Sequence, residues 1–140
     1  MNGIEIRVDS ENKIVIPDIE RFRDKQTLVL VDLIKLDNYI SIYTCEEMQR
    51  LENEIKNRND LSYNNKKKLM RVVFSSASEV DVERDEDLKL KIKLPRKMVD
   101  NKIFEKKLMC VITENYVRLY VPSKLDEFNN NLDTSNGRSR

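Results

Sequence analysis

D-S-E-N-K-I-V-I-P at residues 9–17 and D-L-K-L-K-I-K-L-P at residues 87–95 are two copies of one motif, D-x-x-x-K-I-x-[IL]-P. A second pair of matches follows them, N-Y-I-S-I-Y at residues 38–43 and N-Y-V-R-L-Y at residues 115–120. The displacement is 78 residues for the first pair and 77 for the second. Two matches in the same order and at nearly the same spacing indicate that a unit of about 40 residues is duplicated as a whole.

Apolar and polar residues alternate around the first copy, which is typical of half-buried strands. Residues 4–8 predict one strand and residues 13–16 a second, joined by a turn in which Asn12 tolerates a positive φ. Pro17 ends the second strand because it has no N–H to donate, and a short helix is expected over residues 18–22.

Each unit is expected to continue with two further strands. In the first unit we predict a long buried strand over residues 28–36, a turn at Asp37-Asn38 and a strand over residues 39–43. The second unit repeats the order, with a strand at 89–94, Pro95, a short helix at 97–102, and strands at 108–113 and 116–121 around a turn at 114–115.

Between the two copies, the spacing of apolar residues changes from that of a strand to that of a helix. Met48, Leu51 and Ile55 recur at helical spacing, and a second, basic helix is expected to run from residue 62 or 63 to residue 74. After Pro122 a short helix should begin over residues 123–128, and the polar tail beyond it should be disordered. The predicted organisation is a first repeat at 1–46, a helical insert at 47–78, a second repeat at 79–128 and a tail at 129–140.

Composition excludes several classes of function. The chain has 140 residues with no histidine and only two glycines, so it has no imidazole base and no glycine-rich phosphate loop. We therefore expect no enzyme activity, no cofactor, no metal site and no small-molecule substrate. No long apolar run and no signal peptide stand out, which predicts a cytoplasmic protein with no membrane partner and with two reduced, inert cysteines. The net charge is +1, so any DNA-binding surface must be a local patch.

A single unit of this size cannot bury its own sheet faces, but two units can interleave their strands into a closed barrel. Residues 3–17, which contain the first motif, resemble the swapped-hairpin DNA-binding domain of the AbrB and SpoVT regulators. The tandem arrangement, the helical insert and the stretch at residues 71–79 resemble the MraZ family of bacterial regulators more closely. The resemblance covers about residues 3–128.

This resemblance implies an α+β fold, in which tandem AbrB-like swapped-hairpin units form a pseudo-twofold double-split β-barrel with a helical insert. It also implies a ring-like homo-oligomer that binds direct repeats in promoter DNA, represses transcription and associates with the nucleoid. The family motif is D-x-x-x-R, with the basic residue facing DNA. Asp9 and Lys13 occupy these positions in the first copy, and Asp87 and Lys91 in the second.

The chain departs from the family pattern in three ways. Both arginines of the motif are lysines, which suit phosphate but cannot make the planar, two-pronged contact to guanine. The glycine that usually precedes the basic residue is Asn12 in one copy and Leu90 in the other, where leucine would be strained. About four extra residues near 84–87 are expected to lengthen the second turn.

The candidate DNA-contacting residues each have an alternative role. Lys13 and Lys91 could be ordinary solvated strand lysines. The arginines near the first motif are expected to cluster beside Lys13 and contact phosphate, or else to form salt bridges with Glu5, Glu11, Glu20 or Asp24. The full candidate DNA-binding set is Arg7, Lys13, Arg21, Arg23, Lys89, Lys91, Lys93 and Arg96. The motif and turn residues are Asp9, Asn12, Pro17, Asp87 and Pro95.

Two further patterns have structural interpretations. The tyrosines of the second motif recur at i and i+4, so they share one strand face and predict a core or subunit interface rather than base stacking. The acidic run at residues 81–87 is expected to be a solvated turn rather than a cation site. The near-neutral charge and these acids also motivate a second hypothesis, an interaction or scaffold module that keeps the barrel without reading DNA.

Overall fold

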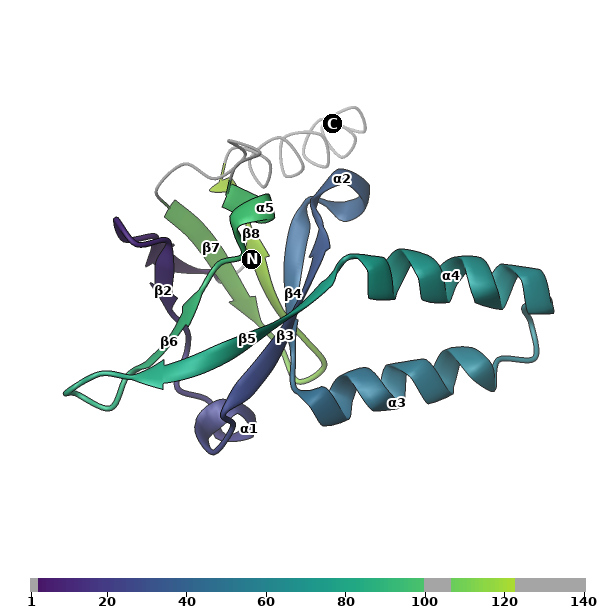
Figure 1. The fold of residues 1–140 in the computed structure, drawn as a ribbon, viewed down its shortest axis with the longest axis horizontal. Helices are drawn as coiled ribbons and strands as arrows, with labels where there is room; N and C mark the ends of the chain where they lie inside the picture. Colours follow the sequence, from purple (N-terminus) through teal and green to yellow (C-terminus); the bar gives the residue numbers. More distant parts are fainter. Residues whose placement is uncertain (1–2, 100–106, 123–140) are drawn as a thin grey trace, which may run out of the picture.

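The computed structural model describes residues 3–99 and 107–122, which combine α and β structure in an antiparallel, nearly closed eight-stranded barrel with five helices (Figure 1). The strand order is β1-β7-β8-β4-β3-β5-β6-β2. The strands are β1 (Ile4–Arg7), β2 (Lys13–Val15), β3 (Thr27–Leu33), β4 (Tyr39–Tyr43), β5 (Ala77–Arg84), β6 (Leu90–Lys93), β7 (Lys107–Ile112) and β8 (Val117–Tyr120). The helices are α1 (Glu20–Arg23), α2 (Ile34–Asp37), α3 (Cys45–Lys56), α4 (Tyr63–Ser75) and α5 (Arg96–Val99).

The predicted first turn is confirmed, and an aspartate closes it. A side-chain oxygen of Asp9 accepts hydrogen bonds from the backbone N–H groups of Glu11 at 2.8 Å and Lys13 at 2.9 Å. The backbone N–H of Asn12 donates to the Asp9 carbonyl, and Asn12 has a φ of 63°. These bonds hold the pKa of Asp9 below its usual range, chiefly through the Lys13 N–H.

The second hairpin uses the same turn, but not where the motif places it. Asp85, rather than Asp87, closes this turn, by accepting from the N–H groups of Asp87 at 3.0 Å and Lys89 at 2.9 Å. The residue with positive φ is Leu88, at 61°, so the expected strain at Leu90 was wrong. Leu90 lies buried in β6.

The extra residues of the second copy therefore lengthen the hairpin arm and leave the turn unchanged. Asp9 precedes Ile14 by five residues, whereas Asp85 precedes Ile92 by seven. The aspartate network sets the turn length, so an insertion is accommodated outside it. The expected turn over residues 81–87 was also wrong in its first half, because residues 77–84 form β5 with Val80 and Val82 packed on the core.

The predicted strand over residues 28–36 is too long. β3 ends at Leu33, and one helical turn, α2, follows although Ile34 and Leu36 continue the alternation of apolar residues. Asp32 accepts a hydrogen bond from the N–H of Ile34 at 3.1 Å, which starts the turn, and Asn38 ends it in a left-handed conformation with a φ of 69°. Asn38 confirms the predicted turn before β4, whose bounds agree with the prediction.

The duplicated motifs pair with each other across the barrel. In the β2–β6 pair, Ile14 lies opposite Ile92, the residue 78 positions later in the sequence. In the β4–β8 pair, Ser41 lies opposite Arg118, the residue 77 positions later. Exchange of the two motif copies leaves both registers unchanged. The β4–β8 pair is central in the strand order and the β2–β6 pair is at its end. In the nearly closed barrel the two pairs therefore lie on opposite sides.

The main core fills the barrel. Phe22 of α1 and Met98 of α5 point into it together with the inward residues of the strands, among them Ile14, Ile40 and Ile92. A smaller cluster lies outside β3, where Val29 and Val31 pack against α3 and α4. These two helices form an arm that projects from the barrel (Figure 1).

Both helices of this arm were predicted and are confirmed. Thr44 and Glu47 form a reciprocal capping box at the start of α3, and Ser62 caps α4. The predicted helix at 123–128, the tail at 129–140 and the continuation of α5 to residue 102 lie outside the described residues.

Adjacent residues of β2 test the register of this barrel. Ile14 is 1% exposed and Val15 38% exposed, because successive side chains of a strand point to opposite faces. Ile14→Ala should lower the free energy of unfolding by roughly 2–5 kcal/mol, and the control Val15→Ala by less than about 1 kcal/mol. Urea denaturation measures both. Equal losses would mean that β2 pairs in another register.

Candidate nucleic-acid interface

The outer side of the β2–β6 pair carries three lysines, Lys13, Lys91 and Lys93, which we call the basic strand face. The inward residues Ile14 and Ile92 fix their orientation, because strand side chains alternate. Lys13 lies directly opposite Lys93. Like charges at such positions destabilise a sheet unless an anion compensates them.

Lys13 has its compensating anions within the chain. Its Nζ lies 3.0 Å from Glu83 Oε2 and 3.3 Å from Glu11 Oε2, and its side chain is 23% exposed. Hydrogen bonding, first to Glu83 and then to Glu11, raises the pKa of Lys13. Sequence reasoning missed Glu83 as a site residue. The signal was the alternation of valines and acids in residues 79–83, which places Glu83 on the outer face of a strand.

Lys13 and Lys91 line one hollow of about 280 Å³. The hollow is not a continuous basic strip, because four carboxylates also line it. Its lining residues are Asp9, Glu11, Lys13, Glu83, Arg84, Asp85 and Lys91. A phosphate approaching Lys13 would have to displace Glu83 and Glu11.

The expected cluster of arginines beside Lys13 does not form. Arg7 lies 3.8 Å from Glu5, is 80% exposed, and lines a different hollow. Arg23 donates to Asp18 at 3.1 Å. Closeness to the motif in the sequence did not predict closeness to Lys13 in space. β1, which carries Arg7, pairs with β7.

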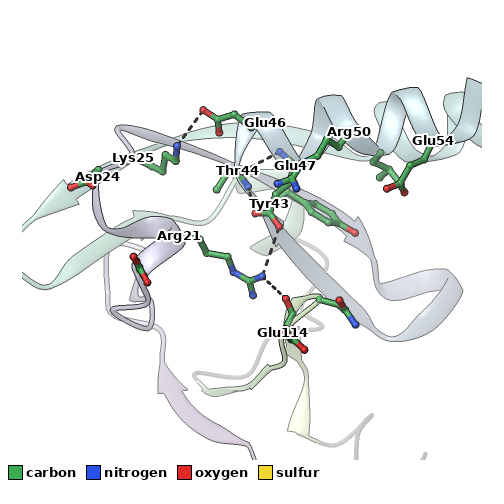
Figure 2. Close-up of a pocket in the computed structure, with 13 residues that line it drawn as sticks. Arg21, Asp24, Lys25, Tyr43, Thr44, Glu46, Glu47, Arg50, Glu54 and Glu114 are labelled. Carbon is green, nitrogen blue, oxygen red and sulfur yellow. Dashed lines mark hydrogen bonds and ion pairs between the residues drawn. The ribbon is translucent and has the colours of Figure 1, made fainter.

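Arg21 lines a hollow of about 640 Å³ between α1, the start of α3 and the β7–β8 turn (Figure 2). Its guanidinium donates to the carbonyl oxygens of Thr113 and Glu114, each at 3.2 Å, and lies 3.9 Å from Glu47. Figure 2 shows the side chain reaching across the hollow between Glu47 and Glu114. Arg21 therefore ties α1 to the β7–β8 turn.

The remaining predicted residues lie around the second motif. Lys89, Lys93 and Arg96 have exposed side chains, and so does Asp87 at the hairpin turn. Pro17 and Pro95 end β2 and β6 in the same way. The Pro17 carbonyl accepts from the backbone N–H of Ile19, the residue before α1, and the Pro95 carbonyl from those of Met98 and Val99 in α5.

The tyrosines of the second motif share one face of the β4–β8 pair, as predicted; it is the outer face and not the barrel core, and a subunit interface there stays a prediction. Tyr39 and Tyr120 have ring centroids 5.5 Å apart. The Arg118 guanidinium carbon lies 4.1 Å from the Tyr39 ring centroid and 3.7 Å from that of Tyr116. Burial raises the pKa of Tyr39. Sequence reasoning missed Arg118, although its position between tyrosines at i±2 is a visible cation–π pattern.

Comparison with known proteins found no family model and no curated protein that matches the chain. Residues 3–99 and 107–122 contain no group of three or more histidine, cysteine, aspartate or glutamate side chains arranged so that it could hold a metal ion, and no helix long and apolar enough to cross a membrane. Cys45 is exposed, whereas burial raises the pKa of Cys110 to about 11. The Cys110 thiol therefore stays protonated at neutral pH.

Substitution distinguishes Arg21 from Arg23. Arg21→Ala leaves two carbonyls without their donor and should cost about 1–3 kcal/mol of stability. Arg23→Ala, the control, removes an exposed ion pair and should cost less than about 1 kcal/mol. Thermal unfolding of both variants measures the difference. Full stability of Arg21→Ala would show that this side chain does not hold α1 in place.

Proposed function

We propose that this chain is a MraZ-like regulator, in which two AbrB-type swapped-hairpin units form a pseudo-twofold barrel that binds DNA as an oligomer. The proposal rests on the pairing of β2 with β6 and of β4 with β8. The register of both pairs stays the same when the two motif copies are interchanged. In addition, β1 pairs with β7 and β5 pairs with β3, so the first strand of each unit lies in the other unit's sheet. A swapped duplication accounts for all four pairings.

The basic strand face is the DNA-contacting surface in this proposal. Lys91 and Lys93 stand on the outer side of β6 and Lys13 beside them on β2, close to the pseudo-twofold axis. Lysine suits phosphate oxygens, and three such contacts supply an electrostatic, salt-dependent affinity. Glu83 and Glu11 compete with phosphate for Lys13, so each face binds weakly.

Weak faces require several copies to act together. A ring-like oligomer aligns several basic strand faces with successive repeats in a promoter, and binding of the first face raises the effective concentration of the others. An oligomer bound in this way blocks the promoter and so represses transcription. The function is therefore proposed for the oligomer at the nucleoid and not for one subunit.

Gel shifts on the chain's own upstream promoter region test this function. We expect tighter binding there than to shuffled DNA of the same length at physiological salt. Equal binding to both would refute the specific-regulator proposal.

A second candidate function, an interaction or scaffold module without DNA reading, rests on the four carboxylates around Lys13 and Lys91. Such a surface suits a protein partner of mixed charge better than a polyanion. The same gel shifts separate the two candidate functions. An oligomer that binds neither the promoter DNA nor the shuffled DNA would favour the scaffold module.

Glu83→Gln is the sharpest test of the basic strand face. It removes the carboxylate closest to Lys13, so DNA affinity should rise several-fold and the salt dependence should become steeper. Glu79→Gln is the matched control, because it makes the same charge change on an exposed position of the same strand and should have little effect. Lys13→Ala should weaken binding and reduce the salt slope by about 1. Equal effects of the two glutamine variants would mean that only net charge matters.

A further inference from the structure

An exposed leucine stands at the tip of the β5–β6 hairpin. Leu88 is 75% exposed and has a φ of 61°, a region that leucine rarely adopts. The turn is closed by Asp85, so the leucine is held in place rather than collapsed onto the barrel. The hairpin projects from the barrel on the side away from the α3–α4 arm (Figure 1).

A second feature is an apolar hollow between β1 and β2, where the barrel is not closed; we call this place the seam. β1 and β2 are the two end strands of the sheet, and no backbone ladder between them occurs in the described residues. A hollow of about 350 Å³ opens there, with Ile4 53% exposed and Val15 38% exposed. Its lining residues are Ile4, Glu5, Ile6, Arg7, Val15, Ile16 and Pro17.

Tip and seam also carry opposite charge. The exposed residues Glu86 and Asp87 precede Leu88 and the exposed Lys89 follows it, so that with Asp85 the tip has a net negative charge. The β1 side of the seam bears Arg7 and the neighbouring Lys107, which share the single carboxylate of Glu5 at 3.8 and 3.7 Å. An acidic tip therefore meets a rim with one excess positive charge.

We propose that the Leu88 tip of one copy docks into the β1–β2 seam of a second copy. Leu88 would bury its side chain against Ile4 and Val15, while Glu86 and Asp87 face Arg7. The tip cannot turn back on its own seam, because β6 is fixed in its ladders with β2 and β5. A second copy is the occupant that supplies both complementary surfaces.

Because tip and seam are different surfaces, this contact is directional. Each copy uses its tip on one neighbour and its seam on the other, which generates a ring if the rotation closes and a filament if it does not. The inference rests on the oligomer of the proposed function and names the contact that builds it. It does not involve Lys13, Lys91 or Lys93.

Three variants test the contact by light scattering after size exclusion, without DNA. Leu88→Asn removes the apolar tip with a residue that accepts positive φ, and Ile4→Glu places an acid in the seam at an exposed position. Both should weaken self-association at least about tenfold. Leu36→Asn, which changes another exposed leucine on α2, is the matched control and should assemble like the wild type.

Mixing the two interface variants gives the sharper result. Leu88→Asn keeps an intact seam and Ile4→Glu keeps an intact tip, so an equimolar mixture should form dimers that grow no further. A wild type that stays monomeric up to about 100 µM, or a Leu88→Asn variant that assembles normally, would overturn the inference. So would a mixture without dimers. DNA fragments with one repeat keep the proposed function separate, because both variants should bind them like the wild type.

Discussion

The pairing of β2 with β6 is the constraint on which the rest of the barrel depends. Each strand is short and carries few inward residues, so neither unit can cover its own sheet faces. Placing Ile14 against Ile92 joins the two apolar halves into one core, with both isoleucines almost fully buried. Because strand side chains alternate, this single register also decides which residues face outward. It places Lys13, Lys91 and Lys93 together on the outer surface, although the motif copies that supply them are 78 residues apart.

The aspartate turns act as a second constraint on the same strands. Asp9 and Asp85 each close a turn of the same length, so the two hairpins differ in the length of their arms and not in that of their turns. The longer arm carries β5 outward and brings Glu83 opposite Lys91 in the ladder and within 3.0 Å of Lys13. The same extension exposes Leu88. The insertion in the second copy thus has two consequences, an acidic neighbour for the basic strand face and a projecting apolar tip.

Local patterns predicted most of the elements. Alternation and Asn12 predicted the first hairpin, and the helical spacing of Met48, Leu51 and Ile55 predicted α3, because these signals act between near neighbours. α2 was missed because Ile34 and Leu36 alternate with polar residues as a strand would, and the Asp32 side chain marks the change. The partners of the site residues were harder to predict. Glu83 is 70 residues from Lys13, and Arg21 is more than 90 from the carbonyls that it binds, so the closed barrel alone brings them together.

The carboxylates around Lys13 bear on why a protein of this kind would need to assemble. A lysine that already has two anionic partners gains little from a single phosphate, because one set of ion pairs is exchanged for another. In the proposed function, the net DNA affinity of one basic strand face would then be small, and it would fall further with salt. Linking several faces would multiply these weak contacts, and discrimination between DNA sites would come from how many faces match the spacing of the repeats. On this argument, removing Glu83 would do more than tighten binding. It would make one face sufficient and reduce the dependence of binding on the number and spacing of DNA repeats.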